Sequence, residues 1–322
     1  MKIGVFGCGA YGMALSDILA NNNHKVTMWT KFEEEMNSLK TTRKNEKVLP
    51  GYILNDNIDI TTDMKKVIEE SELLVMAIPM AFLESTVIEM KPYIKNNNIV
   101  IGTKGIEKSG LTAHEIIKKH LDTDNIGVLS GPSFAIDIVS KNVLGLTVAT
   151  ASKQTKELVE KTFSNNYINL EYISDIAGTE ICGAIKNVAA IGMGILTGLH
   201  TNESTQAMML KRLIEDIRTL LDKLGSNKDT FLAYAGIGDF YLTCTSTKSR
   251  NFSFGKLLGE KNKEEVKTYL ENTTVEGVYT AKSIHSVLKD KNISLPIIDT
   301  IYEIIFNEED PLKLLTVLVE KK

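Results

Sequence analysis

One lysine stands in a stretch of the sequence that is otherwise almost wholly small or apolar. Lys186 lies within E-I-C-G-A-I-K-N-V-A-A-I-G, residues 180–192, which predicts a buried and closely packed helix. A lysine is rarely buried unless something pairs with its ammonium group. The group either extends to the edge of the helix, where water reaches it, or is held inside for proton transfer. The helix residues alone leave both readings open.

A second candidate for chemistry is a glycine-rich loop near the start of the chain. Residues 7–12 read G-C-G-A-Y-G and fit the pattern G-x-G-x-x-G, directly after a predicted strand and at the start of a predicted helix. Glycine allows a tight turn and lets the backbone approach a pyrophosphate closely. The first N–H groups of the helix attract the same anion. The loop therefore predicts dinucleotide binding, and the alternative is a tight turn with a purely structural role.

The end of the second predicted strand bears on the choice between NADH and NADPH. An NADH site usually has Asp or Glu there to bind the ribose hydroxyls. This sequence has Thr30 and Lys31 instead, and the nearest acid along the chain is Glu33. A lysine suits the 2′-phosphate of NADPH, so the sequence favours NADPH. The alternative is that Lys31 is a solvated loop residue.

Two further loops follow predicted strands of the same half of the chain. Residues 102–105 read G-T-K-G and contain Lys104, and residues 130–135 read S-G-P-S-F-A. Ligands of open α/β sheets bind at the carboxyl ends of the strands. Both loops are therefore candidates for ligand contact, although residues 130–135 also have the composition of a plain turn.

The segment 236–251 carries charged residues among glycine, serine and threonine. Asp239 follows G-I-G, as either a turn residue or the partner of a buried cation. Ser249 is a candidate helix cap, which would leave Arg250 and Asn251 in the first turn. A guanidinium beside free backbone N–H groups binds phosphate well. The alternative for Arg250 is an ordinary surface arginine.

The elements that must position these residues change character along the chain. The first half alternates strands with helices, which implies right-handed βαβ units and a parallel sheet. Strands are expected at 2–6, 25–29, 59–60, 73–78, 98–103, 125–130 and 145–150, and helices at 11–22, 33–39, 63–70, from about 82, and 113–120. The second half is helical, at 175–198, 205–224, 227–234, 250–260, 263–270, 277–290, 296–306 and 310–321. The fold class is α/β: a Rossmann-type dinucleotide-binding domain, residues 1–174, followed by an all-helical domain, residues 175–322.

The composition excludes several classes of partner. With 37 Lys and Arg against 41 Asp and Glu, the net charge of −4 gives no basic excess for nucleic acid or an anionic membrane. Cys8, Cys182 and Cys244 are widely spaced and show no metal-ligand or disulfide pattern, which fits a reducing cytoplasm. The longest weakly polar run, residues 188–199, is about 12 residues, short of the roughly 20 of a membrane span. We expect a soluble cytoplasmic protein without a metal.

Taken together, the motifs resemble bacterial NAD(P)-dependent glycerol-3-phosphate dehydrogenase. They occur in the family's order from residue 4 to residue 277 and cover nearly the whole chain, and the specific ones are the lysine–asparagine helix and S-R-N-F-S-F-G. The resemblance implies reversible reduction of dihydroxyacetone phosphate to sn-glycerol 3-phosphate with NADP(H), or with NAD(H), for glycerophospholipid synthesis. The partner it implies is a phosphorylated triose. The apolar content of the helical domain separately predicts a second copy of the chain in a homodimer.

The resemblance also implies a role for individual residues. Lys186 is the proton donor and acceptor, with Asp239 and Lys104 as the other catalytic residues. Substrate contacts fall to Lys104, Gly131, Ser133, Lys186, Asn187, Asp239, Ser249, Arg250 and Asn251. Cofactor contacts fall to Gly7, Gly9, Ala10, Tyr11, Gly12, Lys31, Lys104, Ala135, Arg250 and Glu276.

The sequence departs from the family at two places, and two other classes of protein remain as alternatives. Met80 stands where serine is frequent, and Leu144 to Thr147 replace a proline–threonine pair, which affects expected cofactor contacts only. One alternative is a reductase of a small keto acid, which would need carboxylate recognition and no S-R-N loop. The other is a nucleotide-sensing protein without turnover, which would be expected to lack Lys186 or Asp239.

Overall fold

The computed structural model describes residues 1–107 and 109–320. Contacts divide the chain into two compact units. The first comprises residues 1–104 and 113–176, and the second comprises residues 105–112 and the chain from residue 177 onward. Segment 105–112 thus belongs by its contacts to the helical unit, with Ile106 in that unit's apolar core. The boundary after residue 174 stays a prediction.

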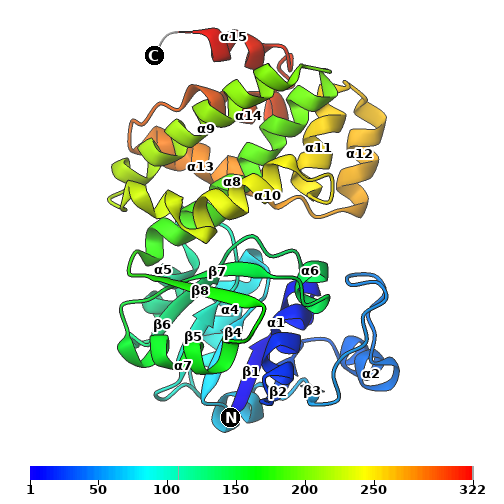
Figure 1. Ribbon diagram of the computed structural model, residues 1–322, viewed down its shortest axis with the longest axis vertical. Coiled ribbons are helices and arrows are strands. Elements are labelled where there is room, and N and C mark those ends of the chain that lie inside the picture. Colours follow the sequence, from blue (N-terminus) through cyan, green and yellow to red (C-terminus); the bar gives the residue numbers. More distant parts are fainter. Residues whose placement is uncertain (108, 321–322) are drawn as a thin grey trace. The chain divides into compact units, whose positions relative to one another are not determined.

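An eight-stranded sheet forms the centre of the first unit (Figure 1). Its order is β3-β2-β1-β4-β5-β6-β7-β8, and every neighbouring pair is parallel except β6 with β7. The strands are β1 Lys2–Phe6, β2 Lys25–Trp29, β3 Ile58–Thr61, β4 Leu73–Met76, β5 Asn98–Ile101, β6 Ile126–Ser130, β7 Leu144–Ala149 and β8 Ile168–Ile173. The order reverses beside β1, which is the position where doubly wound sheets bind their ligands.

Helices cover this sheet on two sides, as the predicted βαβ units require. They are α1 Ala10–Asn21, α2 Glu33–Thr42, α3 Met64–Glu70, α4 Met80–Met90, α5 Ala113–His120, α6 Ala135–Val139 and α7 Lys153–Phe163. Helix α1 contacts α6 and α7, whereas α4 contacts α3 and α5. Helix α1 is buried from Gly12 to Ala20, because it lies against the sheet along most of its length.

The prediction that residues 145–150 form the last strand of the sheet was wrong. Strand β8 and helix α7 follow β7, and β7 runs antiparallel to β6, so the sheet is mixed at this edge. Strand β8 reads I-N-L-E-Y-I and is only partly buried, so it lacks the apolar run that marks a buried strand. Strands β7 and β8 thus run opposite to the other six, and mixed sheets of this kind are common.

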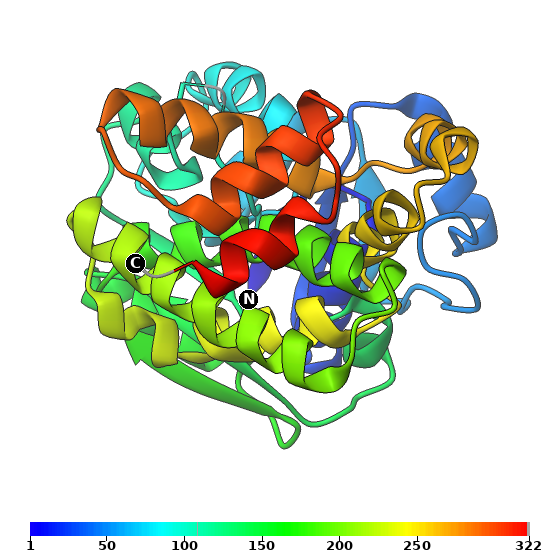
Figure 2. The ribbon, with the colours of Figure 1, turned by 90° about the horizontal axis from the view of Figure 1, so that it is seen from above.

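The second unit is helical, as expected. Its elements are α8 Ile176–Gly198, α9 Glu203–Lys223, η1 Lys228–Leu232, η2 Tyr234–Gly238, α10 Asp239–Thr245, α11 Arg250–Gly259, α12 Lys263–Asn272, α13 Glu276–Asp290, α14 Pro296–Phe306 and α15 Lys313–Val319. Pro296 opens its helix as predicted, whereas α15 begins two residues after Pro311. Figure 2 shows α15, in red, lying against α14, and residues of the two helices are in contact. The π-turn η2 and helix α10 were not predicted.

Helix α8 is the central helix of this unit and packs very closely on α11. A Cβ on Gly194 would lie 2.1 Å from the Phe252 carbonyl oxygen, and one on Gly255 would lie 2.0 Å from the Ile191 oxygen. Only glycine fits such an approach of two backbones. The glycine of S-R-N-F-S-F-G therefore brings the N-terminal turn of α11 beside the middle of α8.

Helix α8 is also long and apolar enough to cross a membrane by length and composition alone. Its most apolar 18-residue window has a mean hydropathy of 1.5 although it contains Lys186, so it extends beyond the run of about 12 weakly polar residues at 188–199. That window is 94% buried within the protein. A core helix accounts for such burial, and its side chains form the apolar centre of the unit.

Candidate active site

The glycine loop has the geometry that a dinucleotide needs. Gly7 adopts φ = +116°, and a Cβ on Gly12 would lie 2.1 Å from the Gly7 oxygen, so both positions require glycine. Gly9 differs, because a Cβ there would meet no atom within 4 Å. Its glycine leaves open space above the N-terminus of α1, where a pyrophosphate can approach the backbone. Gly7, Gly9, Ala10, Tyr11 and Gly12 thus form a loop that fits the diphosphate of NAD(P)H.

The predicted ligand loops of the first unit meet at Tyr11. Its hydroxyl lies 3.4 Å from Ser133 Oγ, and Lys104 Nζ lies 5.6 Å from the centre of its ring. The Lys104 ammonium also donates to the Gly131 carbonyl at 3.5 Å. Ala135 follows as the first residue of α6. The structure therefore brings Lys104, Gly131 and Ser133 to the glycine loop.

The two family departures lie beside these loops. Met80 is the first residue of α4, and Leu144 to Thr147 lie in β7. A Cβ on Gly131 would lie 2.6 Å from the Gly145 oxygen, so β7 packs directly against the S-G-P-S turn. The departure at β7 thus lies in the strand that contacts this turn.

The end of β2 differs from what the sequence suggests. Lys31 Nζ pairs with Glu89 Oε1 at 2.9 Å, and the Lys31 side chain is 63% exposed. No acid stands directly after β2 in sequence, but Glu35, from the first turn of α2, accepts a hydrogen bond from Thr30 Oγ1. Glu33 is thus the nearest acid in sequence, and Glu35 is the acid that contacts the strand end.

The lysine of the apolar helix is held inside the second unit. Lys186 is 7% exposed, and its ammonium donates to Asp239 Oδ1 at 2.6 Å and to Thr243 Oγ1 at 3.0 Å. Thr243 Oγ1 in turn donates to the Asp239 backbone oxygen at 2.6 Å. The buried carboxylate offsets the cost of burying the ammonium. Asp239 is thus the partner of a buried cation, and Lys186 does not extend to water.

A π-turn positions Asp239, the partner of Lys186. Segment η2, Tyr234–Gly238, ends directly before Asp239, and a Cβ on Gly236 would lie 2.2 Å from the Phe231 oxygen. Single π-turns are frequent at functional sites. Asp239 and Thr243 are four residues apart in α10 and share one face. Sequence reasoning missed Thr243, and its spacing from Asp239 would have indicated it once α10 was recognised.

A chain of amides continues from the next residue of α8. Asn251 Nδ2 donates to Asn187 Oδ1 at 3.0 Å, and Asn251 Oδ1 accepts from the Gly277 N–H at 2.8 Å. Asn187 Nδ2 lies 3.4 Å from Glu276 Oε2. These contacts fix the orientation of both amides and bring Glu276, at the start of α13, to the same group.

The predicted cap of α11 is present. Ser249 accepts a hydrogen bond from the Phe252 N–H, and Arg250 is the first residue of the helix with an exposed side chain. The Arg250 carbonyl accepts from Tyr269 Oη–H at 3.2 Å. Arg250 thus stands beside the free N–H groups of a helix start, where anions bind.

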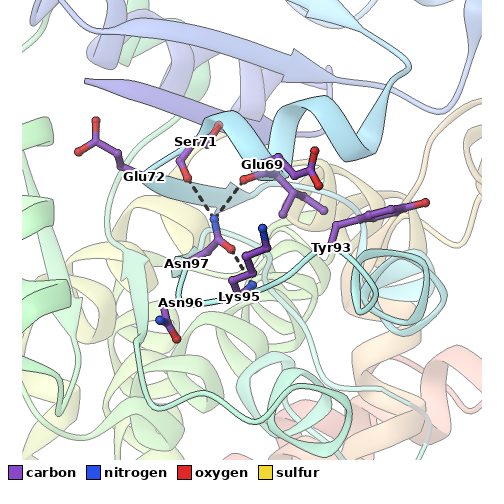
Figure 3. Close-up of a pocket in the computed structure, with 8 residues that line it drawn as sticks. Glu69, Ser71, Glu72, Tyr93, Lys95, Asn96 and Asn97 are labelled. Carbon is purple, nitrogen blue, oxygen red and sulfur yellow. Dashed lines mark hydrogen bonds between the residues drawn. The ribbon is translucent and has the colours of Figure 1, made fainter.

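Two other hollows on the first unit contain none of these residues. One lies at the amino ends of β4 and β5, where the Asn97 amide donates to the Ile68 and Ser71 carbonyls (Figure 3). The other is lined by Asn21, Asn22, Lys141 and residues 165–167. Within residues 1–107 and 109–320, no cluster of three His, Cys, Asp or Glu side chains has a geometry that could hold a metal ion.

A glycine loop at the reversal point of a Rossmann sheet, with a held lysine on a separate helical unit, defines an NAD(P)-dependent dehydrogenase. The chain belongs to the NAD-dependent glycerol-3-phosphate dehydrogenase family. The N-terminal part of that family matches residues 2–156, and its C-terminal part matches residues 175–316.

Individual relatives agree with this assignment. The chain is 35% identical to a glycerol-3-phosphate dehydrogenase (NAD(P)+) of Staphylococcus aureus, over 95% of this chain and 93% of the relative. Its identity to one from Staphylococcus haemolyticus is 33%, over 97% and 95% of the two chains. The crystal structure of glycerol-3-phosphate dehydrogenase from Coxiella burnetii has a TM-score of 0.92 at 28% identity and covers 99% of each chain.

Proposed function

We propose that the chain catalyses the reversible reduction of dihydroxyacetone phosphate to sn-glycerol 3-phosphate with NADP(H) or NAD(H). The observation that carries the proposal is the buried Lys186–Asp239–Thr243 group in a chain of this family. A fixed ammonium of this kind is suited to a reaction that develops charge on a carbonyl oxygen.

The first unit would bind the dinucleotide. Gly7, Gly9, Ala10, Tyr11 and Gly12 would hold its diphosphate, and Ala135 and Lys31 would contact its other parts. When bound, the nicotinamide supplies the hydride for the ketone carbon. Lys104, which is close to Tyr11, would add positive potential for the substrate. Gly131 and Ser133 would contact the substrate through the turn after β6.

The second unit would supply the proton. Lys186 Nζ donates a hydrogen bond to the carbonyl oxygen of the substrate and then transfers a proton as negative charge develops there. Asp239 and Thr243 fix the direction of the ammonium, because both accept hydrogen bonds from it. In the reverse direction the same amine takes the hydroxyl proton of glycerol 3-phosphate.

The substrate phosphate would bind at the start of α11. Arg250 supplies a guanidinium and the helix supplies backbone N–H groups, with Ser249 as cap. Asn187 and Asn251 hold each other in place and would orient the substrate hydroxyl. Glu276 and Arg250 would also contact the dinucleotide. A phosphate fixed at one end sets the position of the ketone at the other.

The test is the absorbance decay of NADPH and of NADH with dihydroxyacetone phosphate, with small keto acids in parallel reactions. Rapid oxidation with the phosphorylated triose alone supports the proposal. Oxidation with a keto acid alone would favour the reductase of small keto acids. Binding of a dinucleotide without oxidation by any substrate would favour a sensor.

The cellular setting is part of the same proposal. A cytoplasmic enzyme that supplies glycerol 3-phosphate to glycerophospholipid synthesis is supported by the family and by three buried free cysteines. A homodimer is supported by the apolar content of the helical unit. Sedimentation velocity measures the mass in solution, and a single species of 35.7 kDa would contradict the dimer.

A further inference from the structure

A carboxylate lies at the end of β2, although the sequence places no acid directly there. Glu35, in the first turn of α2, accepts a hydrogen bond from Thr30 Oγ1, and Thr30 is the residue that follows β2. Thr30 is 4% exposed, and its hydroxyl also accepts from the Phe32 N–H at 3.3 Å. The turn between β2 and α2 therefore folds back and returns the carboxylate of Glu35 to the strand end.

The same strand end contacts the glycine loop. The Gly7 N–H donates to the Trp29 carbonyl at 2.9 Å, and Cys8 Sγ lies 3.8 Å from the same oxygen. Burial and then the charge of Glu35 raise the pKa of the Cys8 thiol well above its usual value. The Glu35 carboxylate is thus close to both the strand end and the loop that would hold the diphosphate.

We propose that Glu35 determines which dinucleotide the chain prefers. Its carboxylate accepts hydrogen bonds from the ribose hydroxyls of NAD(H) and repels the 2′-phosphate of NADP(H). Other NAD sites place an acid at the end of the strand for the first of these tasks, and here the following helix supplies it. The inference rests on the proposed function, since it requires a dinucleotide at the glycine loop.

Lys31 favours the 2′-phosphate of NADPH, but its effect on the preference is weaker than that of Glu35. Its ammonium pairs with Glu89, and its side chain is 63% exposed, so its field is offset by a partner and screened by water. Glu35 is half-buried and fixed by a buried hydroxyl, which reduces the screening of its charge. The chain is therefore expected to bind NADH more tightly than NADPH, the reverse of what Lys31 alone predicts.

The experiment measures the dissociation constants of NADH and NADPH by their fluorescence, without substrate, for the wild type and Glu35→Gln. The substitution should weaken NADH binding by about tenfold, the value of a hydrogen bond to a charged group, and should tighten NADPH binding. Thr30→Val, which removes the hydroxyl that fixes Glu35, should move the ratio of the two constants in the same direction by a smaller factor. Glu34→Gln is the matched control, because Glu34 is an exposed acid on the same turn, and it should leave the ratio unchanged.

The outcomes separate this inference from the proposed function. Tighter binding of NADPH than of NADH by the wild type overturns the inference, as does a Glu35→Gln ratio within about twofold of the wild-type ratio. Either result leaves the proposed function intact if the wild type still reduces dihydroxyacetone phosphate. Failure of the wild type to bind either dinucleotide would overturn both.

Discussion

Lys186 and Asp239, 53 positions apart in the sequence, form a buried ion pair with 2.6 Å between Nζ and Oδ1. Their side chains are 9% and 3% exposed. Burial of an ion pair gives little net stability, and apolar residues of similar volume often serve a core as well. A functional role therefore explains the pair better than stability does, since Asp239 fixes the direction of the Lys186 ammonium.

Replacement of Lys186 by Ala should lower kcat for reduction of dihydroxyacetone phosphate by about 100-fold or more, the usual contribution of a general acid. The affinity for NADPH and NADH should change little, because the glycine loop is in the other unit. Steady-state rates together with fluorescence titrations of both dinucleotides measure the two effects. Lys211→Ala, at an exposed lysine of α9, is the control and should keep the wild-type kcat. A kcat of Lys186→Ala above about a tenth of the wild-type value would show that Lys186 is not the proton donor.

Arg250→Ala should raise KM for dihydroxyacetone phosphate by about tenfold or more, because a charged hydrogen bond to phosphate is lost. The effect on unfolding should be small, since the Arg250 side chain is exposed. Lys256→Ala on the same helix removes a charge that pairs with Glu260 and is the matched control. Competitive inhibition by inorganic phosphate gives an independent measure of phosphate binding by Arg250. An unchanged KM for both the triose and the dinucleotide in Arg250→Ala would refute a role for Arg250 in phosphate binding.

Local motifs predicted much of this architecture from sequence. Three motifs were recognisable because local backbone geometry requires particular residues within a few positions. They are the glycine loop, S-R-N-F-S-F-G and the apolar helix with Lys186. Gly255 is an instructive case: it marks S-R-N-F-S-F-G in sequence, and in the fold it allows α11 to approach α8.

Features that depend on distant contacts were missed. Strand β8 is a half-exposed edge strand, and α10 follows a π-turn with no sequence signal of its own. Thr243 acquires its role only from Lys186, which lies 57 positions away. Glu35 was passed over for a different reason: it lies in the first turn of α2, five residues after Thr30, and not at the strand end where an acid is expected.

Tyr52→Phe should make the protein less stable as the pH rises. The Tyr52 hydroxyl donates to Asp17 Oδ1 at 2.6 Å, and Asn21 Nδ2 donates to Oδ2 at 2.8 Å. Burial raises the pKa of the Asp17 carboxyl above its usual range, while the Tyr52 hydroxyl lowers it. A raised pKa in the folded state contributes stability that is complete below the unfolded value of about 3.9 and is lost as pH rises through the folded value.

Removal of the Tyr52 donor raises the Asp17 pKa further, so the loss of stability relative to wild type should grow as the pH rises through the folded-state pKa of Asp17. It should reach roughly 1–3 kcal/mol, the cost of a buried group without its partner. Urea unfolding curves at a series of pH values measure the difference. Tyr93→Phe, in the same unit, is the control. A difference that is constant with pH, or that shrinks, would contradict the sign.

Gly9→Ala should separate cofactor binding from folding. A methyl group at Gly9 would meet no atom within 4 Å, and its φ of −71° is ordinary for alanine. The melting temperature should therefore stay close to that of the wild type. The same methyl group would fill the space through which a pyrophosphate approaches the backbone, so the affinity for both dinucleotides should fall by about tenfold or more.

The contrasting substitution in the same loop is Gly12→Ala. Its methyl group would lie 2.1 Å from the Gly7 oxygen, so the loop must move and the melting temperature should fall. A clash of this kind belongs to the class of substitutions that cost several kcal/mol. Thermal unfolding and fluorescence titration give a melting temperature and two dinucleotide affinities for each variant, and only Gly9→Ala should lose affinity without losing stability. Unchanged affinity of Gly9→Ala for NADH and NADPH would mean that the open space above α1 does not receive the diphosphate.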